Sequence, residues 1–356
     1  APTLNPLCKG DTNMKKLALF LALALLASLF PAAMAEETLI VYNCYDYIDS
    51  DVIKDFEKET GVKVKYLNYT TNEEMYMKMT SGGGVYDVIF PSDYMIERLI
   101  AEDALMELDY SKIPNAGGML DWLKDTDYDA GSRHSVPYMW GTTGLIYNTT
   151  MVEEPPTKWA DMWDVEYTNN VLMFNNSRDA FAIAQFLLGI DLNTTDKSDW
   201  DKAAEKLIEQ NGVLQGHVMD EVFSKMEGGN AAIAPYYAGD YLTMAENNPD
   251  LKFVYPKEGT NIFVDSMCIP ASSKNVEAAQ MFINFMLDPE VALANAEYLC
   301  YATPNTSVRN NPEYSLKDNK ILYPDNMDSI KTEYFHDLDS DTRSYFESLW
   351  DKVIIN

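Results

Sequence analysis

The chain has 356 residues, of which 47% are hydrophobic, and its formal net charge is −29. A chain of this length exceeds what one hydrophobic core usually needs, so two lobes are expected. The negative charge argues against nucleic acid and anionic membrane surfaces as partners and suits a cationic ligand, although acidity also keeps a secreted protein soluble.

The N-terminal region has the pattern of a secretory signal peptide over residues 14–35. Met14 is followed by two lysines, a short apolar run and the small-residue site Ala33-Met34-Ala35. A run this short favours a cleaved signal over a membrane anchor and predicts an extracytoplasmic protein that begins at Glu36. No cysteine directly follows the run, so a lipid anchor is not indicated. Residues 1–13 form an upstream segment of unknown role.

Strands and helices alternate through the rest of the chain, which indicates α/β lobes built on mostly parallel sheets. The first elements expected are strand Thr38–Asn43, helix Asp51–Thr60 capped by Ser50, strand 62–66, helix Asn72–Met79, strand Val85–Phe90 and helix Tyr94–Ala101. Later elements are strands Val136–Met139 and Gly144–Tyr147, a helix after Asn176, strand Ile262–Ile269, a helix over Ala278–Met286 and helix Thr342–Val353.

No linker separates the two expected lobes, so the lobes must share strands that cross between them. The first lobe is predicted to comprise residues 36–142 and 264–303, and the second residues 143–263 and 304–356. Hinge bending is then expected where the chain crosses, near Gly141–Thr143, Ile262–Asp265 and Tyr301–Asn305. We expect the protein to be a monomer.

Acidic and aromatic residues occur together in four segments at predicted strand or loop ends. In open α/β sheets, ligands lie beyond the carboxyl ends of the strands. An alkyl-ammonium ligand needs carboxylates for its charged ends and aromatic faces for its methylene chain. Any one such pair could be chance in a chain rich in Tyr and Asp, but four pairs favour a cation site. The four segments are Cys44-Tyr45-Asp46-Tyr47, Pro91-Ser92-Asp93-Tyr94, Tyr236-Tyr237-Ala238-Gly239-Asp240 and Phe263-Val264-Asp265.

The sequence contains no recognisable catalytic motif, and we interpret the protein as a non-enzyme without cofactor. A GxSxG elbow, an HExxH helix and a phosphate-loop lysine are all missing. The three histidines are scattered and the cysteine spacing matches no zinc site, so no metal is expected. Trp159 and Trp163 stand at helical spacing, and we interpret them as core residues.

Seven segments, in order, resemble the spermidine/putrescine-binding proteins of bacterial polyamine ABC transporters, members of the type II periplasmic binding protein family. They lie at Tyr42–Tyr47, Tyr86–Ser92, Val136–Thr142, Trp159–Trp163, Asp265–Pro270, Tyr301–Asn305 and Leu322–Asp325. The resemblance implies a two-lobed fold with the ligand in the interlobe cleft. It also implies a periplasmic protein, secreted across the inner membrane, that delivers a polyamine to a membrane permease and its ATPase. Alternatives are another small organic solute, a ligand-reporting partner of a membrane sensor, or a secreted enzyme on this scaffold.

The resemblance also implies site roles, position by position. Carboxylates that hold ligand amines fall on Asp46, Asp179 and Asp265, and on Asp240 as in some putrescine-preferring members. Aromatic walls fall on Tyr47, Tyr94, Tyr237, Phe263 and Tyr301, and a polar wall falls on Ser92.

Three positions depart from the family pattern and leave the choice between spermidine and putrescine open. Cys44 stands where the family usually has Trp, so one wall of the aromatic box is expected to be either missing or replaced by Tyr45. Asn176 replaces a carboxylate, and Phe335 replaces a polar amide. Because the resemblance places Cys44 and Cys300 near the same aromatic box, a disulfide between them is a further expectation. Its alternative is that both, like Cys268, are free packing residues.

Overall fold

The computed structural model describes residues 38–82 and 84–355. The predicted upstream segment 1–13 and signal peptide 14–35 lie outside the described residues. The described residues from Leu39 onward form one compact unit. Among the described residues, no helix is long and apolar enough to cross a membrane.

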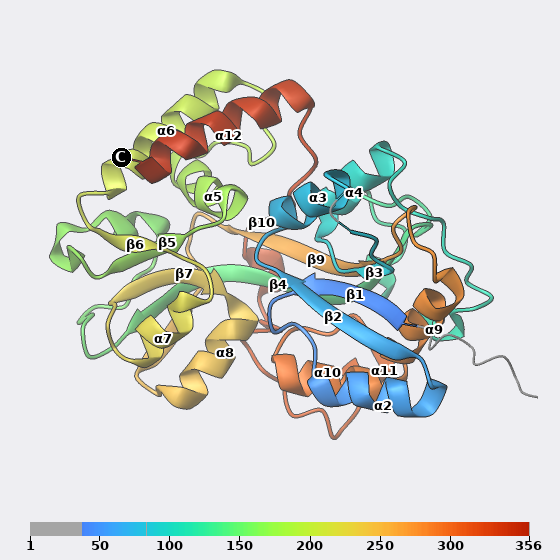
Figure 1. Cartoon of the computed structure of the whole chain (residues 1–356). Coiled ribbons are helices and arrows are strands. Elements are labelled where there is room, and N and C mark those ends of the chain that lie inside the picture. Colours follow the sequence, from blue (N-terminus) through green and yellow to red (C-terminus); the bar gives the residue numbers. More distant parts are fainter. Residues whose placement is uncertain (1–37, 83, 356) are drawn as a thin grey trace, which may run out of the picture. The chain divides into compact units, whose positions relative to one another are not determined.

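The centre of the fold is a single path of strands in the order β2-β1-β3-β9-β4-β7-β5-β6 (Figure 1). Strand β1 pairs in parallel with β3, and β5 pairs in parallel with both β6 and β7. The strands are β1 (Thr38–Cys44), β2 (Lys63–Tyr69), β3 (Val88–Ile89), β4 (Ser135–Asn148), β5 (Val171–Phe174), β6 (Leu214–Val218), β7 (Ile233–Tyr237), β8 (Leu251–Val254), β9 (Thr260–Cys268) and β10 (Thr332–Glu333). The parallel pairs therefore lie at the two ends of the path.

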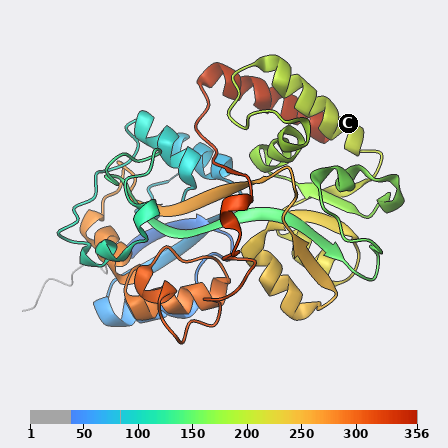
Figure 2. The same ribbon diagram turned by 180° about the vertical axis from the view of Figure 1, so that it is seen from behind.

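Two long antiparallel strands, β4 and β9, join these ends (Figure 2). Strand β9 pairs with β3 at one end, and β4 pairs with β7 at the other. The prediction of two separate strands at 136–139 and 144–147 was wrong, because β4 continues through Gly141 and Thr142 to Asn148. The pairing of β4 passes from β9 at Thr142 to β7 at Thr143, so backbone hydrogen bonding continues across the expected break.

Helices cover both faces of each end of the sheet path, so the structure has two α/β lobes that share β4 and β9 (Figure 1). This confirms the predicted architecture, whereas the lobe boundaries stay a prediction. Around β1–β3 lie α2 (Ser50–Thr60), α3 (Asn72–Thr80), α4 (Asp93–Ala101), α9 (Val276–Met286), α10 (Pro289–Leu299) and α11 (Thr306–Arg309). Around β5–β7 lie α5 (Ser177–Leu188), α6 (Lys197–Gln210), α7 (Glu221–Glu227), α8 (Ala238–Asn247) and α12 (Ser340–Ile355).

Large aromatic side chains fill the core of each lobe. In the first lobe, the rings of Phe56 and Phe282 meet edge to face at 5.0 Å between centroids. In the second, Trp200 stacks on Phe346 at 5.0 Å, which fastens α12 to α6. Trp159 is fully buried, as expected for a core residue, and its Nε1 donates to the Gly259 carbonyl at 2.8 Å. These cores make each lobe a rigid support for the surface that faces the other lobe.

The ends of the helices follow local sequence signals, with one difference from the expectation. The carboxylate of Asp49, not the side chain of Ser50, caps α2 by accepting from the amide of Asp51 at 2.9 Å. Helix α5 begins directly after Asn176, as predicted, and Asn176 is its N-cap. Single turns of 3-10 helix lie at Pro114–Gly118, Asp121–Leu123, Trp159–Trp163, Val165–Tyr167 and Met327–Ser329.

Candidate functional site

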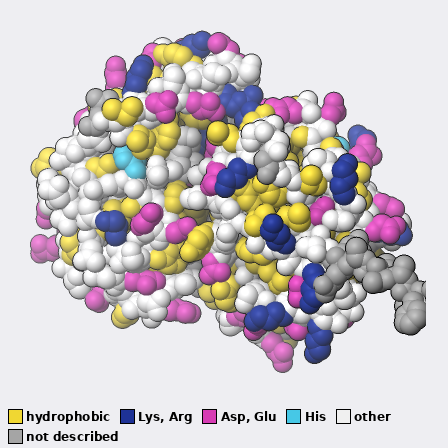
Figure 3. Space-filling model, viewed as in Figure 1, with side chains coloured by type: hydrophobic (Ala, Val, Ile, Leu, Met, Phe, Trp, Pro, Cys, Tyr) yellow, Lys and Arg dark blue, Asp and Glu magenta, His cyan; other side chains and the backbone are white. Residues whose placement is uncertain are grey.

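A cavity of about 620 Å³ lies between the two lobes, a size typical of sites for small molecules. Figure 3 shows hydrophobic and acidic side chains meeting along the middle of the viewed face, between the two ends of the sheet. All twelve residues predicted as ligand contacts line this cavity, although their roles stay predictions: Tyr45, Asp46, Tyr47, Ser92, Tyr94, Asn176, Asp179, Tyr237, Asp240, Phe263, Asp265 and Tyr301. The structure thus brings together residues that are far apart in the sequence.

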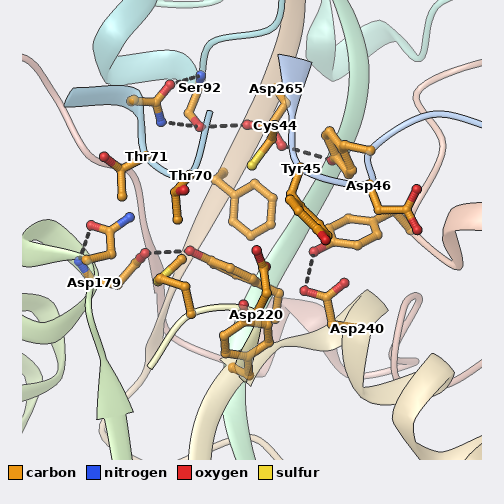
Figure 4. A pocket seen from close by; sticks show the side chains of 18 of the residues that line it. Cys44, Tyr45, Asp46, Thr70, Thr71, Ser92, Asp179, Asp220, Asp240 and Asp265 are labelled. Atoms are coloured by element: carbon orange, nitrogen blue, oxygen red, sulfur yellow. Dashed lines mark hydrogen bonds between the residues drawn. The ribbon is translucent and has the colours of Figure 1, made fainter. Parts of the chain in front are cut away.

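Three of the lining carboxylates each accept a hydrogen bond from a tyrosine hydroxyl (Figure 4). The Tyr47 hydroxyl donates to Asp265 Oδ2 at 2.9 Å. The Tyr237 hydroxyl donates to Asp179 Oδ2 at 2.6 Å, and the Tyr301 hydroxyl donates to Asp240 Oδ2 at 3.0 Å. Each donor fixes its carboxylate in place and leaves further oxygen lone pairs available to a ligand.

Burial raises the pKa of all three carboxyl groups. The pKa of Asp265 is raised to about 6. The pKa values of Asp179 and Asp240 are each raised to about 7. In every case the loss of hydration dominates, and the tyrosine donor partly opposes it by stabilising the anion. A cation placed beside these groups would replace the missing hydration and restore their ionised form.

Aromatic rings run between the carboxylates as a continuous series. The ring centroids of Tyr47 and Tyr301 are 5.1 Å apart, and those of Tyr301 and Phe263 are 6.4 Å apart. The Phe263 ring then meets Tyr237 edge to face at 5.4 Å. These rings present faces and edges that suit a methylene chain, and their π faces also attract ammonium groups.

Two glycines make room for the rings of this series. A Cβ atom on Gly141, in β4, would lie 2.7 Å from Cζ of Phe263. A Cβ atom on Gly239, in the first turn of α8, would lie 2.4 Å from Cδ2 of Tyr301. No real Cβ atom approaches another atom so closely, so both positions require glycine for the rings to stay where they are.

A polar network fixes the wall around Asp265. The Ser92 hydroxyl donates to Asp265 Oδ1 at 2.6 Å, while Asn72 Nδ2 donates to Ser92 Oγ at 3.0 Å. Behind this wall, the buried Asp93 carboxylate accepts from the amides of Tyr94 and Val264. Burial raises the pKa of Asp93 to about 8, so this group is largely neutral near pH 7. Asp93 does not line the cavity.

The start of α5 positions Asp179. The Asn176 side-chain oxygen accepts from the amides of Arg178 at 3.1 Å and Asp179 at 3.5 Å. Asp179 therefore lies in the first turn of α5, where the helix dipole favours a negative charge. Asn176 combines a helix cap with a place on the cavity wall.

The outer part of the cavity is more exposed and also acidic. Asp46 is exposed and accepts from the Tyr298 hydroxyl at 3.2 Å, and Tyr45 is 58% exposed. Asp220 and Glu227 line the cavity too, although neither was predicted from the sequence. The signal for Asp220 was available, because it follows strand β6 in the same way that Asp46 follows β1.

Arg178 was also missed, although it adjoins Asp179. Its side chain is buried and lines the cavity, with the guanidinium carbon 4.6 Å from the ring centroid of Phe335. Burial lowers the pKa of Arg178, and its Nε has no hydrogen-bond partner among the described residues. A positive charge here partly balances Asp179 when the cavity is empty.

The predicted disulfide between Cys44 and Cys300 is not formed, and Cys268 is free as well. Cys300 ends α10 with φ 59°, and its Sγ points to the Glu297 carbonyl at 3.6 Å. This backbone geometry directs the Cys300 thiol back along its own helix. Cys44 lines the cavity, and burial raises the pKa of its thiol to about 12. A neutral thiol therefore stands at the position where the family resemblance implied an aromatic ring.

Residues 51–322 match the family model described as bacterial extracellular solute-binding protein. The spermidine/putrescine-binding periplasmic protein of Salmonella typhimurium is 33% identical to this chain, covering 90% of this chain and 92% of the relative. The putrescine/cadaverine-binding protein of Pseudomonas aeruginosa is 30% identical over 96% of this chain and 99% of the relative.

Solved structures agree with the same fold. The spermidine/putrescine ABC transporter substrate-binding protein of Streptococcus pneumoniae, in complex with calcium and HEPES, matches with a TM-score of 0.75 and 37% identity, covering 90% of this chain and 99% of that chain. A protein of Listeria monocytogenes matches with a TM-score of 0.86 and 37% identity over 89% of this chain and 98% of that chain. The two-lobed architecture is shared across these proteins.

Proposed function

Because this chain belongs to the family of bacterial extracellular solute-binding proteins, we propose that it captures a linear polyamine in its cleft and delivers it to an ABC import permease. In this role the protein is a non-catalytic receptor that acts outside the cytoplasm. Residues 14–35 would direct its export to the periplasm.

One observation carries this proposal: two buried carboxylates, Asp179 and Asp265, and the half-buried Asp240, each held by a tyrosine hydroxyl, surround a series of aromatic rings. Arg178 balances the charge of Asp179 only in part, and no cation offsets Asp240 or Asp265 among the described residues. Because a carboxylate with little hydration and no cationic partner is unfavourable, the cavity is complementary to a ligand with separated positive charges. The rings between them suit the methylene groups that separate the ammonium groups of a polyamine. A neutral sugar would leave the carboxylates uncompensated, and an anion would be repelled.

The relatives support the same ligand class. The Salmonella relative is named for spermidine and putrescine, and the Pseudomonas relative for putrescine and cadaverine. Both proteins extend over nearly all of this chain, so the proposed role does not depend on a separate domain.

Closure of the lobes over the ligand follows from the shared strands. In this proposal both lobes and β9 supply ligand contacts, so all the contacts form only when the cleft is closed. Because the ligand makes more contacts in the closed form, its binding energy favours that form. Bending would concentrate near Gly141–Thr143, Ile262–Asp265 and Tyr301–Asn305. The closed form is the state that a permease would recognise.

Isothermal titration calorimetry of the mature protein with putrescine, cadaverine, spermidine and spermine tests the proposal. We expect saturable binding of at least one of them with one ligand per chain. Asp265→Asn or Asp179→Asn should weaken it by roughly 2–5 kcal/mol, because the ligand ammonium would stay buried without its anion.

Asp250→Asn is the matched control, since Asp250 is exposed and does not line the cavity. This variant should bind like the wild type. Absence of heat with all four amines, together with tight binding of a neutral sugar, would refute the proposed ligand class.

A further inference from the structure

The segment Tyr334–Leu338, which connects β10 to α12, is attached to the second lobe by hydrogen bonds. We refer to this segment as the strap. Asn193, just after α5, makes two of the bonds: its Nδ2 donates to the Tyr334 carbonyl at 2.9 Å, and its Oδ1 accepts from the His336 amide at 2.8 Å. Arg178 Nη2 donates to the His336 carbonyl at 3.4 Å. The strap therefore moves with α5 and α12.

The strap also contacts the first lobe, through hydrogen bonds to Glu97 of α4 and a ring contact with Tyr94 of the same helix. Oε2 of Glu97 accepts from the backbone amide of Asp337 at 2.9 Å. The same oxygen lies 3.3 Å from Nδ1 of His336. In Figure 1 the chain before α12 descends beside α3 and α4, so this contact joins elements from opposite lobes.

This contact closes one end of the cavity. Tyr94, in α4, and Phe335, in the strap, both line the cavity, and their rings meet edge to face at 5.9 Å. Glu97, His336 and Asp337 do not line it. Glu97 therefore holds together two walls of the cavity without being placed to touch a ligand.

We propose that Glu97 is a positioning residue that keeps the cleft shut over its ligand by binding the strap. The inference rests on the proposed function for the identity of the ligand, but the contact between the lobes is independent of it. A residue of this kind slows ligand escape. It does not change the contacts that a ligand makes once the cleft is closed, nor the encounter with the open form.

The dissociation rate of a bound polyamine tests this role, followed by stopped-flow measurement of intrinsic fluorescence. Glu97→Ala should raise the dissociation rate roughly three- to twentyfold, because two hydrogen bonds to a partly exposed carboxylate are lost. The association rate should change little. Glu97→Gln should restore part of the effect, since its amide oxygen can still accept from the Asp337 amide.

Glu277→Ala is the control, because Glu277 is an exposed residue of α9. Its dissociation rate should equal that of the wild type. The proposal would be overturned if the dissociation rate were equal in wild type, Glu97→Ala and Glu97→Gln. It would also be overturned if Glu97→Ala changed only the association rate.

Hydrogen exchange of the Asp337 amide separates this inference from the proposed function, because it needs no ligand. The amide should exchange faster in Glu97→Ala than in wild type and at the wild-type rate in Glu277→Ala. If no polyamine binds but the Asp337 amide exchanges faster only in Glu97→Ala, the proposed function is wrong and the contact between Glu97 and the strap is supported. If polyamine binds and exchange is identical in all three proteins, the strap proposal fails.

Discussion

Polyamine binding should release protons from the cleft, and the number released follows from the three buried carboxyl groups. Their pKa values in the empty protein are about 7 for Asp179 and Asp240 and about 6 for Asp265. At pH 6 the first two are therefore about 90% protonated and the third about half protonated. A cationic ligand lowers all three values by stabilising the anions, so about two protons should leave per ligand bound at pH 6.

The sign of the pH dependence follows directly. The ligand amines have pKa values near that of lysine, about 10, and stay charged throughout. Near pH 6 the polyamine binding constant should rise by up to about a hundredfold per pH unit. It should level off near pH 8, where the three groups are already ionised. Coupling between the carboxyl groups broadens this range and reduces the maximum slope.

The folding stability of the empty protein should depend on pH in the opposite direction: these three groups should make it fall as the pH rises. A carboxyl group whose pKa is raised in the folded state contributes stability that is present below about pH 4 and is lost as the pH rises through about 7. The increase in melting temperature on adding polyamine should therefore be larger at pH 8 than at pH 6.

Calorimetry at pH 6 in two buffers with different ionisation enthalpies counts the released protons. Asp240→Asn should reduce that number by about one, and the exposed Asp250→Asn should leave it unchanged. A buffer-independent binding enthalpy at pH 6, or an affinity that is constant between pH 5.5 and 8, would refute the link between burial and cation binding.

Two further substitutions test the cavity walls. Gly239→Ala should lower polyamine affinity at least tenfold by displacing the ring of Tyr301, even though alanine in a helix is favoured over glycine by about 1 kcal/mol. The control is Gly216→Ala, at an open position of β6, which should not change the affinity measured by calorimetry. Equal affinities in the two variants would contradict the steric argument. Asn176→Asp keeps a helix cap and adds a carboxylate to the cavity, so the ratio of spermidine affinity to putrescine affinity should rise. Competition titrations measure this ratio. A ratio that falls would contradict the idea that the added negative charge favours spermidine.

The sequence predicted the parts of the site that depend on short-range pattern. An acid close to aromatic residues identified Asp46, Asp240 and Asp265. Asp46 and Asp240 lie just beyond the ends of β1 and β7, where ligands of α/β sheets bind, whereas Asp265 lies within β9. Asp179 came only from the family resemblance. Nothing in its local sequence shows that Tyr237, in another element, donates to it.

Features that depend on long-range pairing were beyond sequence reasoning. Gly141 has the local pattern of a strand break, yet β4 continues through it because β9 and β7 supply consecutive partners. The thiols of Cys44 and Cys300 were expected to pair because the family resemblance places both near the aromatic box. Bond formation also depends on side-chain direction, and the Cys300 thiol points to the Glu297 carbonyl of its own helix. The interlobe role of Glu97 has no sequence signal, since its partner is a backbone amide.

The tyrosine–aspartate pairs also determine which molecules the cleft rejects. Lysine and ornithine carry the same ammonium-bearing chain as cadaverine and putrescine, with one added carboxylate. Inside the cleft that carboxylate would lie close to aspartates that are already short of hydration, and the tyrosine hydroxyls that could have solvated it are engaged with those aspartates. Like-charge repulsion would then oppose binding. We therefore expect the cleft to bind an amine in preference to its parent amino acid, because only the amino acid carries the carboxylate.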